Sequence, residues 1–232
     1  MSRAEMLEPL DAYALWAASY PPHAHNPVMY AEERVMLGLM PADLHGLSVL
    51  DAGCGSGRYM LHALERGAAQ VMGVDLSVEM LERAGTELAA HDRGAMIELA
   101  LGDLEALPAP DTFADLTVCG LAIGHLIRLQ PALAELRRVT RPGGTILCSD
   151  VHPIGHALGW RRDFKSGGGH YAVRHTPHFY SHWHAACAAL HLQIARVLEP
   201  MLDPVDIPAG AHFDPLALEV PVALVFELRR LP

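Results

Sequence analysis

Short apolar segments alternate with amphipathic ones along the middle of the chain. Each apolar segment is long enough for one buried strand, and each is followed by a stretch in which apolar residues recur with helical spacing. Strands are expected at residues 47–51, 71–75, 97–101, 114–119 and 145–149. Strands that alternate with helices form parallel sheets whose two faces are covered by helices. The pattern therefore predicts one α/β domain.

The two ends of the chain depart from this alternation. Residues 7–40 have helical spacing with a break at Pro21-Pro22, so an N-terminal helical cap is expected over residues 1–45. Residues 152–180 have no clean periodicity and are expected to form a lid, inserted in a domain that spans residues 46–232. The domain is completed by a helix and two strands, expected at 179–190, 193–198 and 220–228.

Composition and charge narrow the classes of partner. Hydrophobic residues make up 51% of the 232 residues, which rules out general disorder. The net charge is −10 with histidine neutral, Lys165 is the single lysine, and the arginines are scattered, so no nucleic-acid partner is expected. No apolar run approaches the roughly 20 residues of a membrane span, and the acidic N-terminal segment is unlike a secretory signal. The sequence predicts a cytosolic protein without a membrane partner.

The most informative segment is Val49-Leu-Asp-Ala-Gly-Cys-Gly-Ser-Gly57, which joins the first expected strand to a helix. A glycine-rich turn at this place lets a ligand approach the backbone, because no Cβ stands in the way. The dinucleotide pattern G-x-G-x-x-G fails, since Arg58 occupies its third glycine, and the lysine of a phosphate-binding loop is absent. Asp51 would repel an anionic pyrophosphate and attract a free amino group. A purely structural turn is the alternative.

Acidic residues also end the second and third expected strands. Asp75 stands where a carboxylate can accept hydrogen bonds from both hydroxyls of a ribose. Asp103 can accept a hydrogen bond from an adenine amino group while Leu104 covers the ring. Ligands of open α/β sheets bind outside the carboxyl ends of the strands, and Asp51, Asp75 and Asp103 all lie on that edge. The three carboxylates therefore predict one ligand site there.

This combination resembles the class I S-adenosylmethionine-dependent methyltransferases, most closely the small-molecule branch that includes the ubiquinone and menaquinone biosynthesis enzymes. The resemblance implies a Rossmann-like seven-stranded sheet in the order 3-2-1-4-5-7-6, with the last strand antiparallel and helices on both faces. It also implies S-adenosyl-L-methionine as the cofactor and S-adenosyl-L-homocysteine as the product. The matching segments, which follow one another in the family's order, are residues 49–57, 73–77, 102–118 and 141–150.

The resemblance also assigns residues to parts of the cofactor. Asp51 and the three glycines would hold the methionine part, Asp75 the ribose, Asp103 and Leu104 the adenine, and Leu121 would line the sulfur. The segment from Tyr13 to Tyr20 resembles the family's aromatic lead-in, with Ala14 where an aspartate is common, and its tyrosines would cap the cofactor. Core packing is the alternative for these aromatic side chains. The expected cofactor contacts are Tyr13, Tyr20, Asp51, Gly53, Gly55, Gly57, Asp75, Leu76, Asp103, Leu104 and Leu121.

Candidate catalytic residues follow the fourth and fifth strands. A neutral imidazole at His125 could take a proton from a hydroxyl or amine as the methyl group arrives, although a histidine at this place can also merely pack. Asp150 and His152 would face the same cavity. The lid is rich in histidine, and His178 and His182 could share one helix face, but no cysteine or carboxylate lies near them in sequence, so no metal is expected. The expected substrate contacts are Tyr20, His125, His175, His178 and Tyr180.

The sequence thus predicts an enzyme that transfers a methyl group from S-adenosyl-L-methionine to an oxygen or nitrogen atom of a small-molecule acceptor by in-line displacement. The cap and lid would exclude water from the reaction. Two alternatives remain open: methyl ester formation on an acyl group bound to a carrier protein, and a non-catalytic protein that binds S-adenosylmethionine. The chain is expected to act as a monomer or a homodimer.

Overall fold

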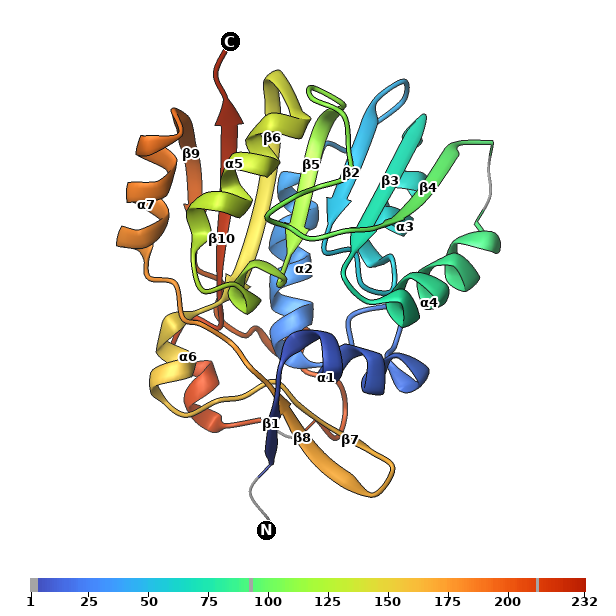
Figure 1. The fold of residues 1–232 in the computed structure, drawn as a ribbon. Coiled ribbons are helices and arrows are strands. Elements are labelled where there is room, and N and C mark those ends of the chain that lie inside the picture. Colours follow the sequence, from blue (N-terminus) through green and yellow to red (C-terminus); the bar gives the residue numbers. More distant parts are fainter. Residues whose placement is uncertain (1–3, 92–93, 212) are drawn as a thin grey trace.

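The computed structural model describes residues 4–91, 94–211 and 213–232 and has a seven-stranded sheet at its centre (Figure 1). The first five strands pair in parallel, and the sixth in spatial order is antiparallel to both of its neighbours. Numbered along the chain, the strands have the predicted order 3-2-1-4-5-7-6 with the last strand antiparallel. In spatial order they are β4 (Met96–Leu101), β3 (Gln70–Asp75), β2 (Ser48–Ala52), β5 (Ala114–Gly120), β6 (Thr140–Val151), β10 (Ala223–Arg230) and β9 (Leu192–Leu198).

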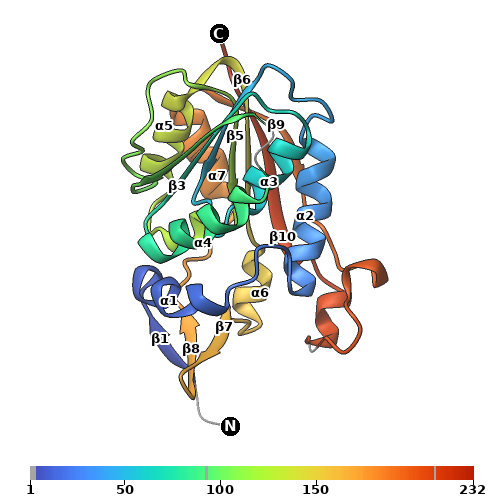
Figure 2. The ribbon, with the colours of Figure 1, turned by 90° about the vertical axis from the view of Figure 1, so that its right-hand side faces the viewer.

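Helices cover both faces of this sheet, because successive residues of the central strands point to opposite sides. Val49 of β2 lies in one core and its neighbour Leu50 in a second core. Figure 2 shows α2 and α3 on one side of the sheet and α5 and α7 on the other. The first core is covered by α2 (Pro27–Leu39), α3 (Arg58–Glu65) and α4 (Val78–Ala89), and the second by α5 (Leu129–Val139) and α7 (Tyr180–Ala189).

A second sheet of three strands lies beyond the carboxyl ends of the parallel strands (Figure 1). It pairs β1 (Glu5–Leu7) with β8 (Gly169–Val173) and β8 with β7 (Asp163–Ser166), and α1 (Pro9–Trp16) packs on it. Trp16 of α1 stacks on Phe164 of β7 with ring centroids 4.5 Å apart. These four elements, hereafter the small subdomain, join the start of the chain to the lid.

Two expectations about the ends of the chain differ from the structure. The segment 1–45 is not one helical cap, since residues 5–7 form a strand and α2 packs against β6 and β10 of the main domain. The lid contains a β-hairpin that periodicity did not reveal. Its two-residue loop is Gly167-Gly168, with φ of +55° and +81°, as a type I′ turn requires. A short helix, α6 (Pro153–Ala157), leads from β6 into this hairpin.

No helix among the described residues combines the length and the apolar character needed to cross a membrane. The cytosolic location stays a prediction.

Candidate active site

A cleft lies between the carboxyl ends of the parallel strands and the small subdomain. The loops after β2, β3, β4 and β5 line it, together with residues of α1 and Arg162 from the lid. Its open space, including the part that faces solvent, is about 1020 Å³. All the expected cofactor contacts except Gly57 line this cleft: Tyr13, Tyr20, Asp51, Gly53, Gly55, Asp75, Leu76, Asp103, Leu104 and Leu121.

The turn after β2 depends on glycine. The φ angles of Gly53, Gly55 and Gly57 are +75°, +54° and +86°, in the left-handed region that favours glycine. A Cβ on Gly53 would lie 2.5 Å from the Cβ of Ala122 in the loop after β5. Gly57 lies outside the cleft, at the N-cap of α3, where a Cβ would lie 3.4 Å from that of Ala84 on α4. Gly53 and Gly55 therefore face the ligand side, and Gly57 lets two helices approach.

Asp75 holds this turn in shape. Its Oδ2 accepts a hydrogen bond from the backbone N–H of Gly55 at 2.7 Å, and its Oδ1 accepts one from the N–H of Ser77 at 3.0 Å. Burial raises the pKa of Asp75, and these N–H groups oppose the rise. Each carboxylate oxygen has a further lone pair. Asp75 can therefore accept hydrogen bonds from a ligand while it supports the turn.

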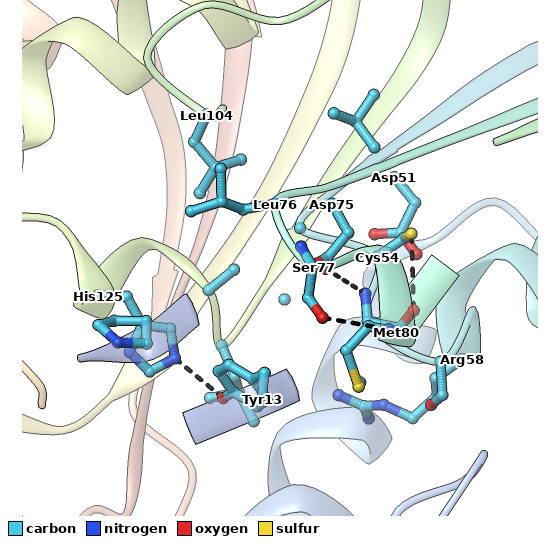
Figure 3. Close-up of a pocket in the computed structure, with 18 of the residues that line it drawn as sticks. Tyr13, Asp51, Cys54, Arg58, Asp75, Leu76, Ser77, Met80, Leu104 and His125 are labelled. Carbon is cyan, nitrogen blue, oxygen red and sulfur yellow. Dashed lines mark hydrogen bonds between the residues drawn. The ribbon is translucent and has the colours of Figure 1, made fainter. Parts of the chain in front are cut away.

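Asp51 provides an unpartnered acceptor at the same end of the cleft, opposite the end with Tyr13 and His125 (Figure 3). It is 1% exposed, and its Oδ2 has no hydrogen-bond partner within the described chain. Burial raises the pKa of Asp51 to about 7, against the opposing effect of the Arg58 guanidinium. A buried carboxylate oxygen of this kind is a suitable partner for a cationic amino group.

The pKa of Asp51 makes binding of such a ligand depend on pH. Asp51 is ionised above about pH 7 and neutral below, so the affinity for S-adenosylhomocysteine should fall as the pH is lowered from 7.5 to 6, by up to about tenfold per unit. Calorimetric titration across this range measures the effect. In Asp51→Asn the affinity should be weaker at pH 7.5 and nearly constant. An equal pH dependence in the wild type and this variant would show that another group titrates.

The opposite end of the cleft carries three linked polar side chains. Nη1 of Arg162 donates to the Tyr13 hydroxyl, and this hydroxyl donates to Nε2 of His125 at 3.0 Å. Nδ1 of His125 donates to the carbonyl oxygen of Arg174 at 3.1 Å, which assigns the ring proton to Nδ1. Burial and the charge of Arg162 lower the pKa of His125 to about 3, and burial raises that of Tyr13 to about 12. Tyr13 is therefore protonated and His125 neutral throughout the physiological pH range.

The lid segment after β8 holds the loop that carries His125. The N–H of Thr176 donates to the carbonyl oxygen of Gly124 at 2.7 Å, and Nε2 of His178 donates to that of Leu126 at 2.9 Å. Both bonds flank His125 in sequence. His178, expected as a substrate contact, does not line the cleft and instead fixes the backbone around His125.

Three further candidates also lie outside the cleft wall. Nε2 of His175 and Oδ1 of Asp150 form a hydrogen-bonded pair, 2.8 Å apart. The pair lies against Gly124, since a Cβ on this glycine would be 2.1 Å from Nε2 of His175. Nδ1 of His152 accepts from the N–H of Ile154 at 3.2 Å and caps α6. The three side chains support the loop and the lid, and none of them lines the cleft.

The remaining lid candidates lie on α7 or directly before it. Tyr180 is 47% exposed and stacks over Phe226 of β10, away from the cleft. The rings of His178 and His182 are neighbours, with centroids 6.3 Å apart. Among the described residues no group of three or more histidine, cysteine, aspartate or glutamate side chains is arranged to hold a metal ion.

Sequence reasoning missed Glu32 and Arg162. Glu32 of α2 is fully buried and accepts hydrogen bonds from Arg58, the Tyr59 hydroxyl and Ser149, so it ties the glycine turn to β6. An acid in helical register with buried apolar residues of the same helix could have indicated it. The sequence around Arg162 does not indicate that this side chain lines the cleft, because its position depends on how the β7–β8 hairpin packs against α1 and β1.

The open sheet with an antiparallel last strand, the glycine-rich turn after β2 and the acidic residues at or near the ends of β2, β3 and β4 agree with the resemblance to the class I S-adenosylmethionine-dependent methyltransferases. Residues 50–148 match the family model described as a methyltransferase domain.

Relatives and solved structures agree with this assignment. A malonyl-[acyl-carrier protein] O-methyltransferase of Pectobacterium atrosepticum is 45% identical over 111 residues, which are 48% of this chain and 41% of that protein. The chain thus spans less than half the length of this relative. An S-adenosylmethionine-dependent methyltransferase from Mesorhizobium loti has the same fold, with a TM-score of 0.67 at 24% identity, over 86% of this chain and 98% of that one. A geranyl diphosphate C-methyltransferase from Streptomyces coelicolor A3(2) has a TM-score of 0.66 at 15% identity, over 100% of this chain and 91% of that one.

The residues of the cleft fit S-adenosylmethionine. The unpartnered oxygen of Asp51 suits the amino group, Asp75 suits the ribose hydroxyls, and the turn at Gly53 and Gly55 lines the cleft between them. Leu76 and Leu104 supply apolar side chains to the same cleft, where the adenine ring needs them. These residues would hold the cofactor at the end away from His125.

Proposed function

We propose that this chain transfers a methyl group from S-adenosylmethionine to an oxygen or nitrogen atom of a small-molecule acceptor. One observation carries the proposal: a single cleft has a nucleoside and amino-acid end at Asp51 and Asp75 and a separate polar end at Tyr13, His125 and Arg162. When bound, the cofactor's sulfonium supplies the electrophilic methyl group. The cleft holds both reactants in line and shields them from water, which contributes about 7–11 kcal/mol to lowering the barrier.

Two other functions remain candidates. The similarity to malonyl-[acyl-carrier protein] O-methyltransferases over 111 residues favours ester formation on an acyl group bound to a carrier protein. A non-catalytic protein that binds S-adenosylmethionine would use the Asp51 and Asp75 end alone. The polar end of the cleft argues for a second reactant and against this binding-only function.

The proposal is tested by binding and by turnover. Calorimetry should give a micromolar dissociation constant for S-adenosylmethionine. Incubation with methyl-labelled S-adenosylmethionine and an extract of the source cells should then transfer label to a small metabolite, identified by mass spectrometry. Label on a carrier protein would select the second function. Tight binding of S-adenosylmethionine with no transfer of label would support the non-catalytic function.

We infer that His125 contributes less to the rate than a general base would. A base with a pKa of about 3 is a poor proton acceptor at neutral pH, and its Nε2 already accepts the Tyr13 hydroxyl. We therefore expect His125→Ala to lower kcat less than about tenfold, below the 10²–10⁴-fold of general-base catalysis, with a flat profile from pH 6 to 9. Initial rates with labelled cofactor measure this. A hundredfold loss that shrinks at high pH would make His125 the base.

A further inference from the structure

Arg162 places a positive charge at the acceptor end of the cleft without a bound counter-charge. It lies between β7 and α6 in sequence, and its side chain lines the cleft beside Tyr13 and His125. No carboxylate of the described chain forms an ion pair with Arg162. Arg162 is half-buried, so its charge is partly shielded from water and would gain from a partner of opposite charge.

One edge of the Arg162 guanidinium is available to a ligand. Nη1 donates to the Tyr13 hydroxyl and, at 3.5 Å, to the carbonyl oxygen of Leu121. Within residues 4–91, 94–211 and 213–232, neither Nε nor Nη2 of Arg162 has a hydrogen-bond acceptor. This edge of the guanidinium has the fork geometry that binds a carboxylate through two parallel hydrogen bonds.

The surrounding charges leave Arg162 available. Burial lowers the pKa of Arg162, but Tyr13, Tyr20 and Asp150 outweigh it, so the guanidinium stays charged. Asp150 contributes through space, since its Oδ1 is already paired with His175. The carboxylates of Asp51 and Asp75 lie at the other end of the cleft (Figure 3). A ligand anion would therefore find its partner at the acceptor end.

We propose that the methyl acceptor is a carboxylate, held by the Nε and Nη2 edge of Arg162 beside Tyr13 and His125. The inference rests on the proposed function and narrows the acceptor to an acid that becomes a methyl ester. The Tyr13 hydroxyl and the carbonyl oxygen of Leu121 accept hydrogen bonds from the guanidinium and hold it in place, so Arg162 acts as a specificity-determining residue.

The chemistry of this step balances without a base. One carboxylate oxygen forms a bond to the methyl carbon, the bond from that carbon to sulfur breaks, and its electron pair stays on sulfur. An anion and a cation become a neutral ester and a neutral thioether, and no proton is released. A neutral His125 and a protonated Tyr13 fit such a reaction, because neither has to accept a proton. The ester product no longer pairs with Arg162, which favours its release.

The first test uses the lability of methyl esters in alkali. After incubation with methyl-labelled S-adenosylmethionine and an extract of the source cells, the products are treated with mild base, which releases methanol from esters and leaves methyl ethers and methylamines intact. Most of the transferred label should appear as methanol. Label that is transferred but stable to base would overturn the carboxylate while leaving methyl transfer in place. No transfer at all would overturn the proposed function itself.

The second test uses two neighbouring arginines. Arg162→Gln should raise the KM for the labelled acid at least about 100-fold, while Arg161→Gln, at an exposed arginine outside the cleft, should leave it unchanged. Arg162→Lys keeps the positive charge but loses the two parallel N–H donors, so its KM should lie between those of Arg162→Gln and Arg161→Gln. The dissociation constant of S-adenosylmethionine should change less than threefold in Arg162→Gln. If it rises as much as the KM, and 5′-methylthioadenosine binding does not change, Arg162 holds the cofactor's own carboxylate and the inference fails.

Discussion

Gly53→Ala should lower the affinity for S-adenosylmethionine by about 100-fold or more and also destabilise the fold. An alanine at φ +75° costs about 1–2 kcal/mol in backbone strain. Its Cβ would also lie 2.5 Å from the Cβ of Ala122, which has no rotamer to move away, and such overlap costs about 1–3 kcal/mol. Relief requires the turn after β2 to shift into the space that the ligand needs. Calorimetry and thermal unfolding measure the two effects.

Gly46→Ala is the matched control for this prediction. Gly46 has nearly the same φ, +76°, but no heavy atom lies within 4 Å of a Cβ built there. This variant should show the backbone strain alone, a modest loss of stability with unchanged affinity. If Gly53→Ala binds S-adenosylmethionine as well as Gly46→Ala does, the turn after β2 does not approach the ligand.

The central sheet could be predicted from the sequence because both of its faces are buried. Runs such as Val71-Met-Gly-Val-Asp75 are apolar at every inward and outward position, and glycine or an acid ends each run. The strand expected at 145–149 is longer than its apolar run, since β6 starts at Thr140. Pro142 and Gly143 lie at an exposed end of β6, next to an irregularity in its pairing with β5, where the ladder tolerates them.

The hairpin of the lid escaped prediction for a physical reason. The strands β7 and β8 are 4 and 5 residues long and bury only a few side chains against α1, so they show no clean alternation. The local signal was Gly167-Gly168, a dipeptide typical of a type I′ turn. Pairing of β1 with β8 joins residues far apart in sequence, and no local pattern contains that information.

The two ends of the cleft also differ in how far they could be predicted from the sequence. Asp51 and Asp75 lie at the carboxyl ends of two neighbouring parallel strands, and Gly53 directly follows the first, so the sequence predicts that they lie close together. Arg162 and Tyr13 meet only because the lid and α1 form one subdomain. The cofactor end could therefore be predicted from sequence, and the acceptor end required the structure.

Asp75→Ala should weaken the binding of S-adenosylmethionine by about 2–4 kcal/mol, since two hydrogen bonds from the ribose to a charged acceptor are lost. The N–H groups of Gly55 and Ser77 lose their acceptor as well, so the glycine turn loosens. Asp75→Asn should be nearly as damaging, because its NH₂ group would face one of these two N–H groups. Isothermal titration at pH 8, where Asp51 is ionised, measures the loss.

Asp103→Ala serves as the control for the Asp75 variants. Asp103 is exposed and accepts one hydrogen bond from the N–H of Glu105 within its own loop, at 2.8 Å. A single contact to the adenine at an exposed position is worth about 0.5–1.5 kcal/mol, so the affinity should fall by about tenfold or less. Equal losses in Asp75→Ala and Asp103→Ala would mean that the turn after β2 does not depend on the Asp75 carboxylate. An unchanged dissociation constant in Asp75→Ala would remove Asp75 from the ribose site and, with it, the orientation that places the methyl group toward Tyr13 and His125.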